Sequence, residues 1–135
     1  SLTKNADANT INPLVPEKHI TAGDNVTLSC KYSGTVNTLQ WYRQYPGSRI
    51  EFLIFATELS GQSEHALRLS STADRGNKQM HLNIFLTEME DSAIYYCALS
   101  SMFWQEKILL FPATTVAMFK IYSGIVSIPD PNLRI

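Results

Sequence analysis

The 135-residue chain has the composition of one globular domain, with 44% hydrophobic, 10% aromatic and 17% charged residues. Its 11 Lys and Arg residues and 12 Asp and Glu residues leave a net charge of −1 without any basic run, which argues against a nucleic-acid-binding protein. No apolar stretch approaches the about 18 residues that cross a bilayer, and the chain starts with neither Met nor a signal-peptide pattern, so we expect a mature chain or a fragment without a membrane-spanning segment.

Short segments with a period-two alternation, separated by glycine and proline, predict an all-β domain. In chain order these segments cover residues 25–30, 39–44, 50–55, 79–84 and 93–97. The first and fourth alternate between apolar and polar residues, which indicates strands with one face in water and places Leu82 in the core. The other three carry apolar or aromatic residues on both faces, as in strands that are covered on both sides.

The doubly apolar segments predict an unusual surface. Their residues on the side away from the core would form an apolar outer face consisting of Tyr42, Gln44, Ile50, Phe52 and Tyr96. A contiguous face of this kind is uncommon on a monomer and indicates a surface that binds a protein partner. The alternative is that a helix or loop of the same chain covers the face, although no segment shows a convincing helical period.

The chain has two cysteines, Cys30 and Cys97, and both fall on the inward series of their segments. Taken alone, the pair is compatible with a disulfide or with two buried free thiols. Trp41 lies on the next segment after the first cysteine, Tyr95 lies just before the second, and residues 91–93 read Asp-Ser-Ala. This combination resembles the immunoglobulin sandwich. The resemblance implies an intersheet disulfide between the two cysteines, a core that contains the tryptophan and the tyrosine, and an oxidising compartment.

Three stretches make the resemblance more specific. Residues 39–47 read Leu-Gln-Trp-Tyr-Arg-Gln-Tyr-Pro-Gly, residues 68–74 read Arg-Leu-Ser-Ser-Thr-Ala-Asp, and residues 91–99 read Asp-Ser-Ala-Ile-Tyr-Tyr-Cys-Ala-Leu. Together they look like a T-cell receptor alpha-chain variable domain over about residues 10 to 100. The resemblance implies an immunoglobulin variable-type two-sheet sandwich, with a structural ion pair between Arg68 and Asp91.

The resemblance also implies a receptor domain that works by binding and is not an enzyme. Such a domain would pair through the apolar outer face with a T-cell receptor beta chain, with Gln44 exchanging hydrogen bonds with a glutamine of the partner. The pair would read a peptide bound to a major histocompatibility complex molecule at the extracellular face of the plasma membrane. The antigen-contact loops would present Tyr32, Thr35, Asn37, Thr57, Glu58, Ser100, Phe103 and Trp104. The alternatives are a variable-type adhesion or inhibitory receptor that works unpaired, and a delta-chain or antibody light-chain variable domain.

After the second cysteine, the resembled family carries a joining strand with the pattern Phe-Gly-x-Gly, whereas residues 111–114 here read Phe-Pro-Ala-Thr. Proline donates no ladder hydrogen bond and threonine rarely adopts a positive φ, so residues 105–116 are expected to pair poorly or differently. We therefore expect a variable-type domain over residues 10–116 with a degenerate joining strand, and a tail over 117–135 that faintly resembles the start of a constant region. The alternative is unrelated sequence translated beyond an unrearranged segment that ends near Ser100.

No pattern of catalytic, cofactor-binding or metal-binding residues is evident. His19, His65 and His81 share no ligand spacing with a carboxylate or a thiolate, and the chain has neither a Gly-x-Ser-x-Gly turn nor a glycine-rich phosphate loop. We therefore expect no catalytic residue, no metal and no cofactor. Residues 25–27 read Asn-Val-Thr, an N-glycosylation acceptor pattern, which makes Asn25 a candidate glycan site.

Overall fold

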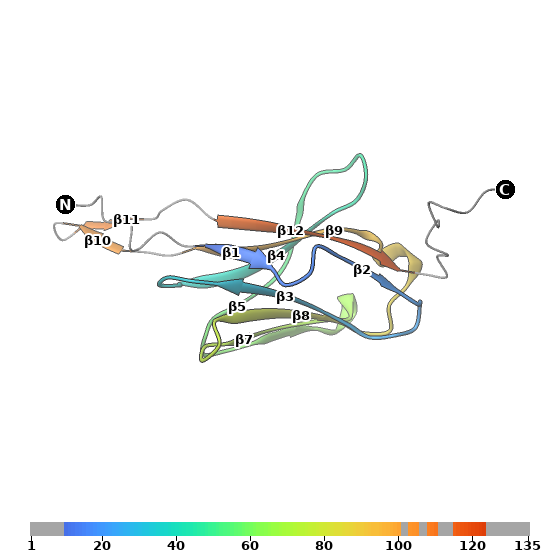
Figure 1. The fold of residues 1–135 in the computed structure, drawn as a ribbon, viewed down its shortest axis with the longest axis horizontal. Coiled ribbons are helices and arrows are strands. Elements are labelled where there is room, and N and C mark those ends of the chain that lie inside the picture. The colour runs from blue at the N-terminus through green and yellow to red at the C-terminus, as the bar shows by residue number, and fades with distance from the viewer. Residues whose placement is uncertain (1–9, 101–102, 106–107, 111–114, 124–135) are drawn as a thin grey trace.

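Two five-stranded β-sheets pack against each other, and a two-stranded hairpin lies at one end of them (Figure 1). The computed structural model describes residues 10–100, 103–105, 108–110 and 115–123, the last three ranges as strand backbone. The first sheet has the order β1 (Ile11–Pro13), β3 (Val26–Tyr32), β8 (Gln79–Ile84), β7 (Leu69–Asp74) and β6 (Gln62–Glu64). The second sheet has the order β2 (Glu17–Ile20), β12 (Thr115–Ser123), β9 (Ala93–Ser100), β4 (Thr38–Gln44) and β5 (Glu51–Ala56). The expected all-β two-sheet sandwich is confirmed.

The remaining elements are short. The hairpin consists of β10 (Phe103–Gln105) and β11 (Ile108–Leu110), which pair antiparallel. Two 3-10 helices, η2 (His65–Leu67) and η3 (Met89–Asp91), lie in the connections that precede β7 and β9. Strands β2 and β12 run parallel to each other, and the other neighbouring strands run antiparallel.

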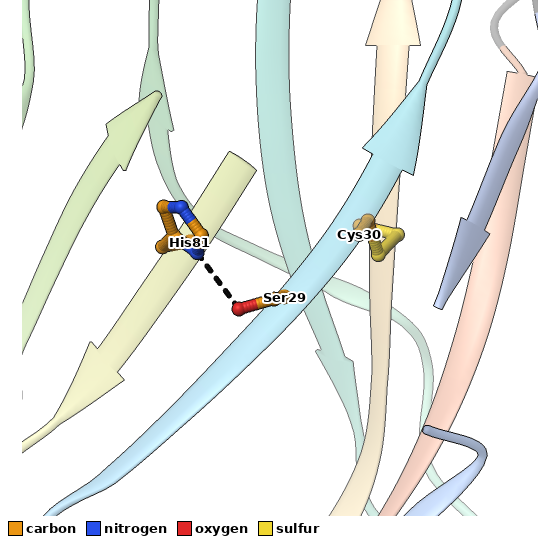
Figure 2. The surroundings of a disulfide bond; sticks show 4 residues. Ser29, Cys30 and His81 are labelled. Carbon is orange, nitrogen blue, oxygen red and sulfur yellow. Dashed lines mark hydrogen bonds between the residues drawn. A yellow bond between two sulfur atoms is a disulfide. The ribbon is translucent and has the colours of Figure 1, made fainter. Parts of the chain in front are cut away.

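The alternating residues of β3 and β8 give the first sheet one dry and one wet face. Alternate residues of both strands are buried in the core, and Leu82 is 0% exposed. Between them, polar side chains bond across the outer face. The Thr27 hydroxyl donates to Asn83 Oδ1 at 2.7 Å, and Ser29 Oγ lies 2.7 Å from His81 Nδ1 (Figure 2). These cross-strand bonds satisfy polar groups on the outer face, and the core packs against the inner face.

A bulge in the second sheet orients β5. Trp41 lies opposite Ile54, but the next residue of β4, Tyr42, lies opposite Phe52, so Leu53 has no cross-strand partner. An extra residue of this kind lets two consecutive side chains point the same way. Leu53 and Ile54 are accordingly 6% and 1% exposed, while Phe52 lies on the outer face opposite Tyr42.

The chain changes sheets after β5. Strand β6 pairs with β7 of the first sheet, with Ser63 opposite Ser70, and β5 is left as the edge of the second sheet. The crossing requires close backbone approach at Gly61, where an added Cβ would lie 2.6 Å from the Ser71 carbonyl oxygen. Only glycine fits at that distance, because the neighbour is a backbone atom held in a ladder.

The last strand lies further along the chain than the joining strand expected at residues 105–116. Strand β12 pairs with β9 over residues 115–121 and with β2 over 120–123, whereas residues 108–110 pair within the hairpin. Residues 108–110 thus pair differently from the ladder of β9, and the strand beside β9 extends past residue 116. The physical reason is that the run from Thr115 to Ser123 is rich in β-branched and aromatic residues and contains no proline or glycine. Residues 111–114 and 124–135, on which the motif match and most of the expected tail fall, lie outside the described residues.

Candidate functional site: an aromatic sheet face and a cluster of loops

A disulfide joins the two sheets at the centre of the core. Cys30 of β3 and Cys97 of β9 are bonded, with their Cα atoms 6.7 Å apart, and both residues are 0% exposed (Figure 2). Trp41 lies opposite Cys97 in the ladder between β4 and β9 and is also fully buried. The bridge and the indole together fill the space between the sheets and hold them at a fixed spacing. The expected intersheet disulfide is confirmed.

A bidentate ion pair closes the end of the sandwich away from the hairpin. Arg68 Nη1 and Nη2 donate to the two carboxylate oxygens of Asp91, each at 3.0 Å, and Nη1 also donates to two backbone carbonyls after β8. Asp91 is 3% exposed, accepts a further bond from the Glu88 amide at 2.8 Å, and receives the Tyr95 hydroxyl at its carbonyl at 2.8 Å. The bond to Asp91 raises the pKa of Arg68, and burial raises the pKa of Tyr95. This acidic turn is thus a structural corner.

The outer side of β4, β5 and β9 carries what we call the aromatic face, defined as Tyr42, Gln44, Ile50, Phe52 and Tyr96. Tyr42 lies opposite Phe52 in one ladder and opposite Tyr96 in the other. The rings of Tyr42 and Phe52 meet edge to face with their centroids 5.7 Å apart. Ile50 and Phe52 are 51% and 54% exposed, so no segment of the described chain covers the β5 side of this face.

Gln44 holds a fixed orientation within the aromatic face. Its Oε1 accepts from the Tyr96 hydroxyl at 2.6 Å, and its Nε2 donates to the Ser48 carbonyl at 3.1 Å. Ser48 belongs to a tight turn that the Ser48 amide closes on the Tyr45 carbonyl, with Gly47 at φ 73° supplying the positive φ that the turn needs. A primary amide has two N–H donors and two acceptor lone pairs. These contacts therefore leave Gln44 able to donate one more bond and accept one more.

The residues expected in the first contact loop differ in their exposure to solvent. Tyr32 ends β3 and is 2% exposed because it continues the inward series of that strand, which corrects its expected place on a contact surface. Thr35 and Asn37 are exposed in the connection between β3 and β4. The Asn37 amide donates to the Ser100 carbonyl at 2.8 Å, which ties this connection to the end of β9.

The second expected loop follows β5. Thr57 and Glu58 are half-buried there, and Thr57 forms an isolated bridge with Ser60. The Glu58 carboxylate accepts the Tyr32 hydroxyl at 2.6 Å. Glu58 is therefore bonded within the chain, whereas the neighbouring Leu59 is 84% exposed.

The third expected segment starts at the end of β9. The Ser100 hydroxyl lies 2.6 Å from that of Thr38 and accepts from Gln40 Nε2 at 2.9 Å. Phe103 and Trp104 belong to β10, in the hairpin at the end of the sandwich where the β3–β4 connection also lies (Figure 1). The structure thus brings the three segments together at one end.

Two cations that the sequence reasoning overlooked organise these surfaces. Lys78 donates to the Gly34 carbonyl at 3.0 Å, and no local pattern could have revealed this contact because the fold alone brings residues 34 and 78 together. Arg43 pairs with Glu51 at 2.7 Å and lies 4.8 Å from the centroid of the Tyr45 ring. Opposite charges on the two sides of the expected Pro-Gly turn were a usable signal for that pair.

Two further kinds of feature, a metal site and a membrane-spanning helix, are absent from the described residues. Across residues 10–100 and the strand segments that follow, no group of three or more His, Cys, Asp or Glu side chains is placed to hold a metal ion. Within the same described part of the chain, no helix has the length and apolar character that a membrane span requires.

Comparison with known proteins identifies the class. Residues 16–113 match the family model of the immunoglobulin V-set domain. Human T cell receptor alpha variable 17 is 37% identical over 79 residues, which cover 58% of this chain and 70% of that protein. Human T cell receptor alpha variable 25 is 33% identical over 81 residues (60% and 73%), and human T cell receptor alpha variable 36/delta variable 7 is 40% identical over 77 residues (56% and 66%).

The chain belongs to the immunoglobulin V-set family. Within that family it is a domain of the T-cell receptor alpha variable type, as its two-sheet sandwich, its intersheet disulfide and these relatives together show.

Proposed function

We propose that this chain is the alpha half of an antigen receptor, paired through its aromatic face with a beta-chain variable domain. The observation that carries the proposal is the exposure of Ile50 and Phe52, at 51% and 54%, on a face that is otherwise ordered by internal contacts. Apolar side chains at the centre of a protein interface are typically held in place before binding and become buried by the partner. The sandwich of a second variable domain is a partner of matching chemistry.

Gln44 supports a partner that presents an amide. Its two internal bonds leave one donor and one acceptor free, which is the set that two glutamines need to bond reciprocally. An amide that is buried in an aromatic interface without such a partner would cost about 1–3 kcal/mol. Pairing in a shifted register would leave the second N–H and the second lone pair of that amide unsatisfied, so Gln44 would fix the register of the two domains.

The loop cluster at the hairpin end is the proposed ligand-reading surface. Thr35, Asn37 and Leu59 are exposed there, and the third segment continues into the hairpin that contains Phe103 and Trp104. A mixture of Ser, Thr, Asn, Gly and aromatic residues suits adaptable recognition. We propose that this surface contacts a peptide held by a major histocompatibility complex molecule, at the extracellular face of a plasma membrane, and that the domain acts by binding without catalysis.

The pairing proposal is tested with the full chain and a panel of beta-chain variable domains. Phe52→Asp should weaken heterodimer formation by about a hundredfold, because it places a charge in the buried centre of the interface. Analytical ultracentrifugation measures the dissociation constant. Phe85→Asp is the matched control, since Phe85 is 41% exposed but follows β8 of the other sheet, and it should change the constant by less than about threefold.

Two results would contradict the proposal. Equal weakening by both substitutions would show that the aromatic face has no special role in pairing. Absence of a heterodimer between the unmodified chain and every beta-chain domain would favour the unpaired adhesion or inhibitory receptor.

We also propose that Asn25 carries an N-linked glycan. Asn25 is exposed just before β3, and its Oδ1 accepts the Leu86 amide at 2.9 Å. Glycosylation modifies Nδ2 and leaves that bond in place. Chain secreted by a eukaryotic host should lose mass on glycosidase treatment, and Asn25→Gln should abolish the loss. Thr27→Ser should preserve the loss, and an unmodified wild-type chain would refute the assignment.

A further inference from the structure

The ammonium group of Lys78 lies between the first and second contact loops. Its Nζ donates to the Gly34 carbonyl of the first loop at 3.0 Å and lies 3.8 Å from Glu58 Oε2 of the second. It also lies 5.7 Å from the centroid of the Tyr32 ring, within reach of a cation–π interaction. One side chain from the β7–β8 turn therefore contacts a main-chain acceptor of one loop and a charged side chain of the other.

Glu58 completes the connection from the second loop. The same Oε2 atom that faces Lys78 accepts the Tyr32 hydroxyl at 2.6 Å, and the Glu58 side chain is only 16% exposed. Burial of Tyr32 and its bond to Glu58 raise the pKa of the Tyr32 phenol, so it remains a donor. A carboxylate so withdrawn from water needs a cation or several donors. Glu58 is thus held from two sides, by Tyr32 of the core and by Lys78.

The turn that presents Lys78 is itself ordered. Asp74 Oδ1 accepts the Asn77 amide at 3.1 Å and Asp74 Oδ2 accepts the Asn77 side-chain amide at 2.7 Å, which lowers the pKa of Asp74. Lys78 leaves the turn at a positive φ of 55°, and its carbonyl accepts the Tyr32 amide at 3.0 Å. The backbone of Lys78 is therefore anchored to β3. A contact between its side chain and a loop thus restricts the movement of that loop relative to the sheet.

We propose that Lys78 is a positioning residue that couples the first and second contact loops, through Gly34 in one and Glu58 in the other, so that the two loops behave as one rigid unit. This inference rests on the proposed function in one respect only, that the two loops contact a ligand. A ligand that meets two loops already ordered loses less conformational entropy on binding than one that must order each loop separately. Glu58 then holds the loops in place from inside the domain, and exposed neighbours such as Thr35 and Leu59 form the surface that contacts the ligand.

The experiment measures hydrogen exchange in the full chain without any ligand or partner. Each loop contains an amide that is protected by a hydrogen bond: Asn37 bonds Ser100 in the first loop, and Thr57 bonds Ser60 in the second. Lys78→Met should accelerate exchange at both amides by about tenfold, as expected for loss of bonds to a charged group. Arg75→Met, which removes the same charge from the same turn, should change both by less than about twofold.

The coupling is isolated by substituting the other end. Glu58→Gln keeps an acceptor for Tyr32 but removes the ion pair, and it should accelerate Asn37 as well as Thr57. In the Lys78→Met background the same substitution should have no further effect on Asn37. Lys78→Arg should restore protection at both amides, and a thermal melt of each variant verifies that it is folded.

Two outcomes would overturn the proposal. One is an effect of Glu58→Gln that is confined to Thr57, and the other is an equal response to Lys78→Met and Arg75→Met. Because no receptor partner or peptide enters the measurement, a failed pairing experiment would leave this result interpretable, and loss of the coupling would leave the pairing proposal intact.

Discussion

Replacing Cys30 and Cys97 together with alanine should lower the free energy of unfolding by about 4 kcal/mol, the loop-closure entropy for cysteines 67 residues apart. Both residues are 0% exposed and lie beside Trp41, so loss of their packing adds to that figure. Urea unfolding followed by tryptophan fluorescence measures the change. The m-value should rise, since an unfolded chain without the bridge exposes more surface.

The single substitutions separate the bridge from its packing. Cys30→Ala alone already removes the covalent link, so the double variant should be only slightly less stable than either single variant. If the loss of stability in the double variant equalled the sum of the losses in the two single variants, packing at each site, and not the bridge, would dominate. A loss below about 1 kcal/mol in the double variant would equally contradict the loop-closure account.

Asp91→Asn should lower the free energy of unfolding by roughly 2–3 kcal/mol. An amide has one oxygen where the carboxylate offers two to Arg68, and its NH2 group would face a guanidinium N–H. The estimate lies below that for a fully buried pair because the Arg68 side chain is 27% exposed. The Arg68 guanidinium also holds two backbone carbonyls beyond β8, so the corner should loosen as a unit. Chemical denaturation of the full chain measures the loss.

Two variants serve as controls for the corner. Glu51→Gln breaks another Arg–carboxylate pair, with Arg43, but that carboxylate is 48% exposed, so the loss should stay below about 1 kcal/mol. Tyr95→Phe removes only the hydroxyl that bonds the Asp91 carbonyl, and should cost about 1 kcal/mol. If Asp91→Asn were no more costly than Glu51→Gln, the corner would contribute little to stability.

The residues of the aromatic face could be predicted from the sequence, whereas the hydrogen bonds between their side chains could not. Alternation along residues 39–44 and 93–97 is enough to assign Tyr42, Gln44 and Tyr96 to one side of the sheet. The bond from Tyr96 to Gln44 joins residues 52 positions apart in the sequence, and no local pattern reports it. The contact loops show the same limit, because the burial of Tyr32 follows from the length of β3, and strand ends are poorly marked by composition.

The one-dimensional pattern suffices to tell which side chains of the central strands face the core, because in a strand that choice depends only on a period of two. It also suffices to find the cysteine, tryptophan and tyrosine residues that fill the centre. Which strands become neighbours was settled by the folded chain: β6 joins β7 where Gly61 permits close approach, and β12 lies parallel to β2. Lys78 and Glu58 likewise come into contact only in the folded structure. Such pairings depend on contacts between residues far apart in the chain, and local periodicity carries no information about them.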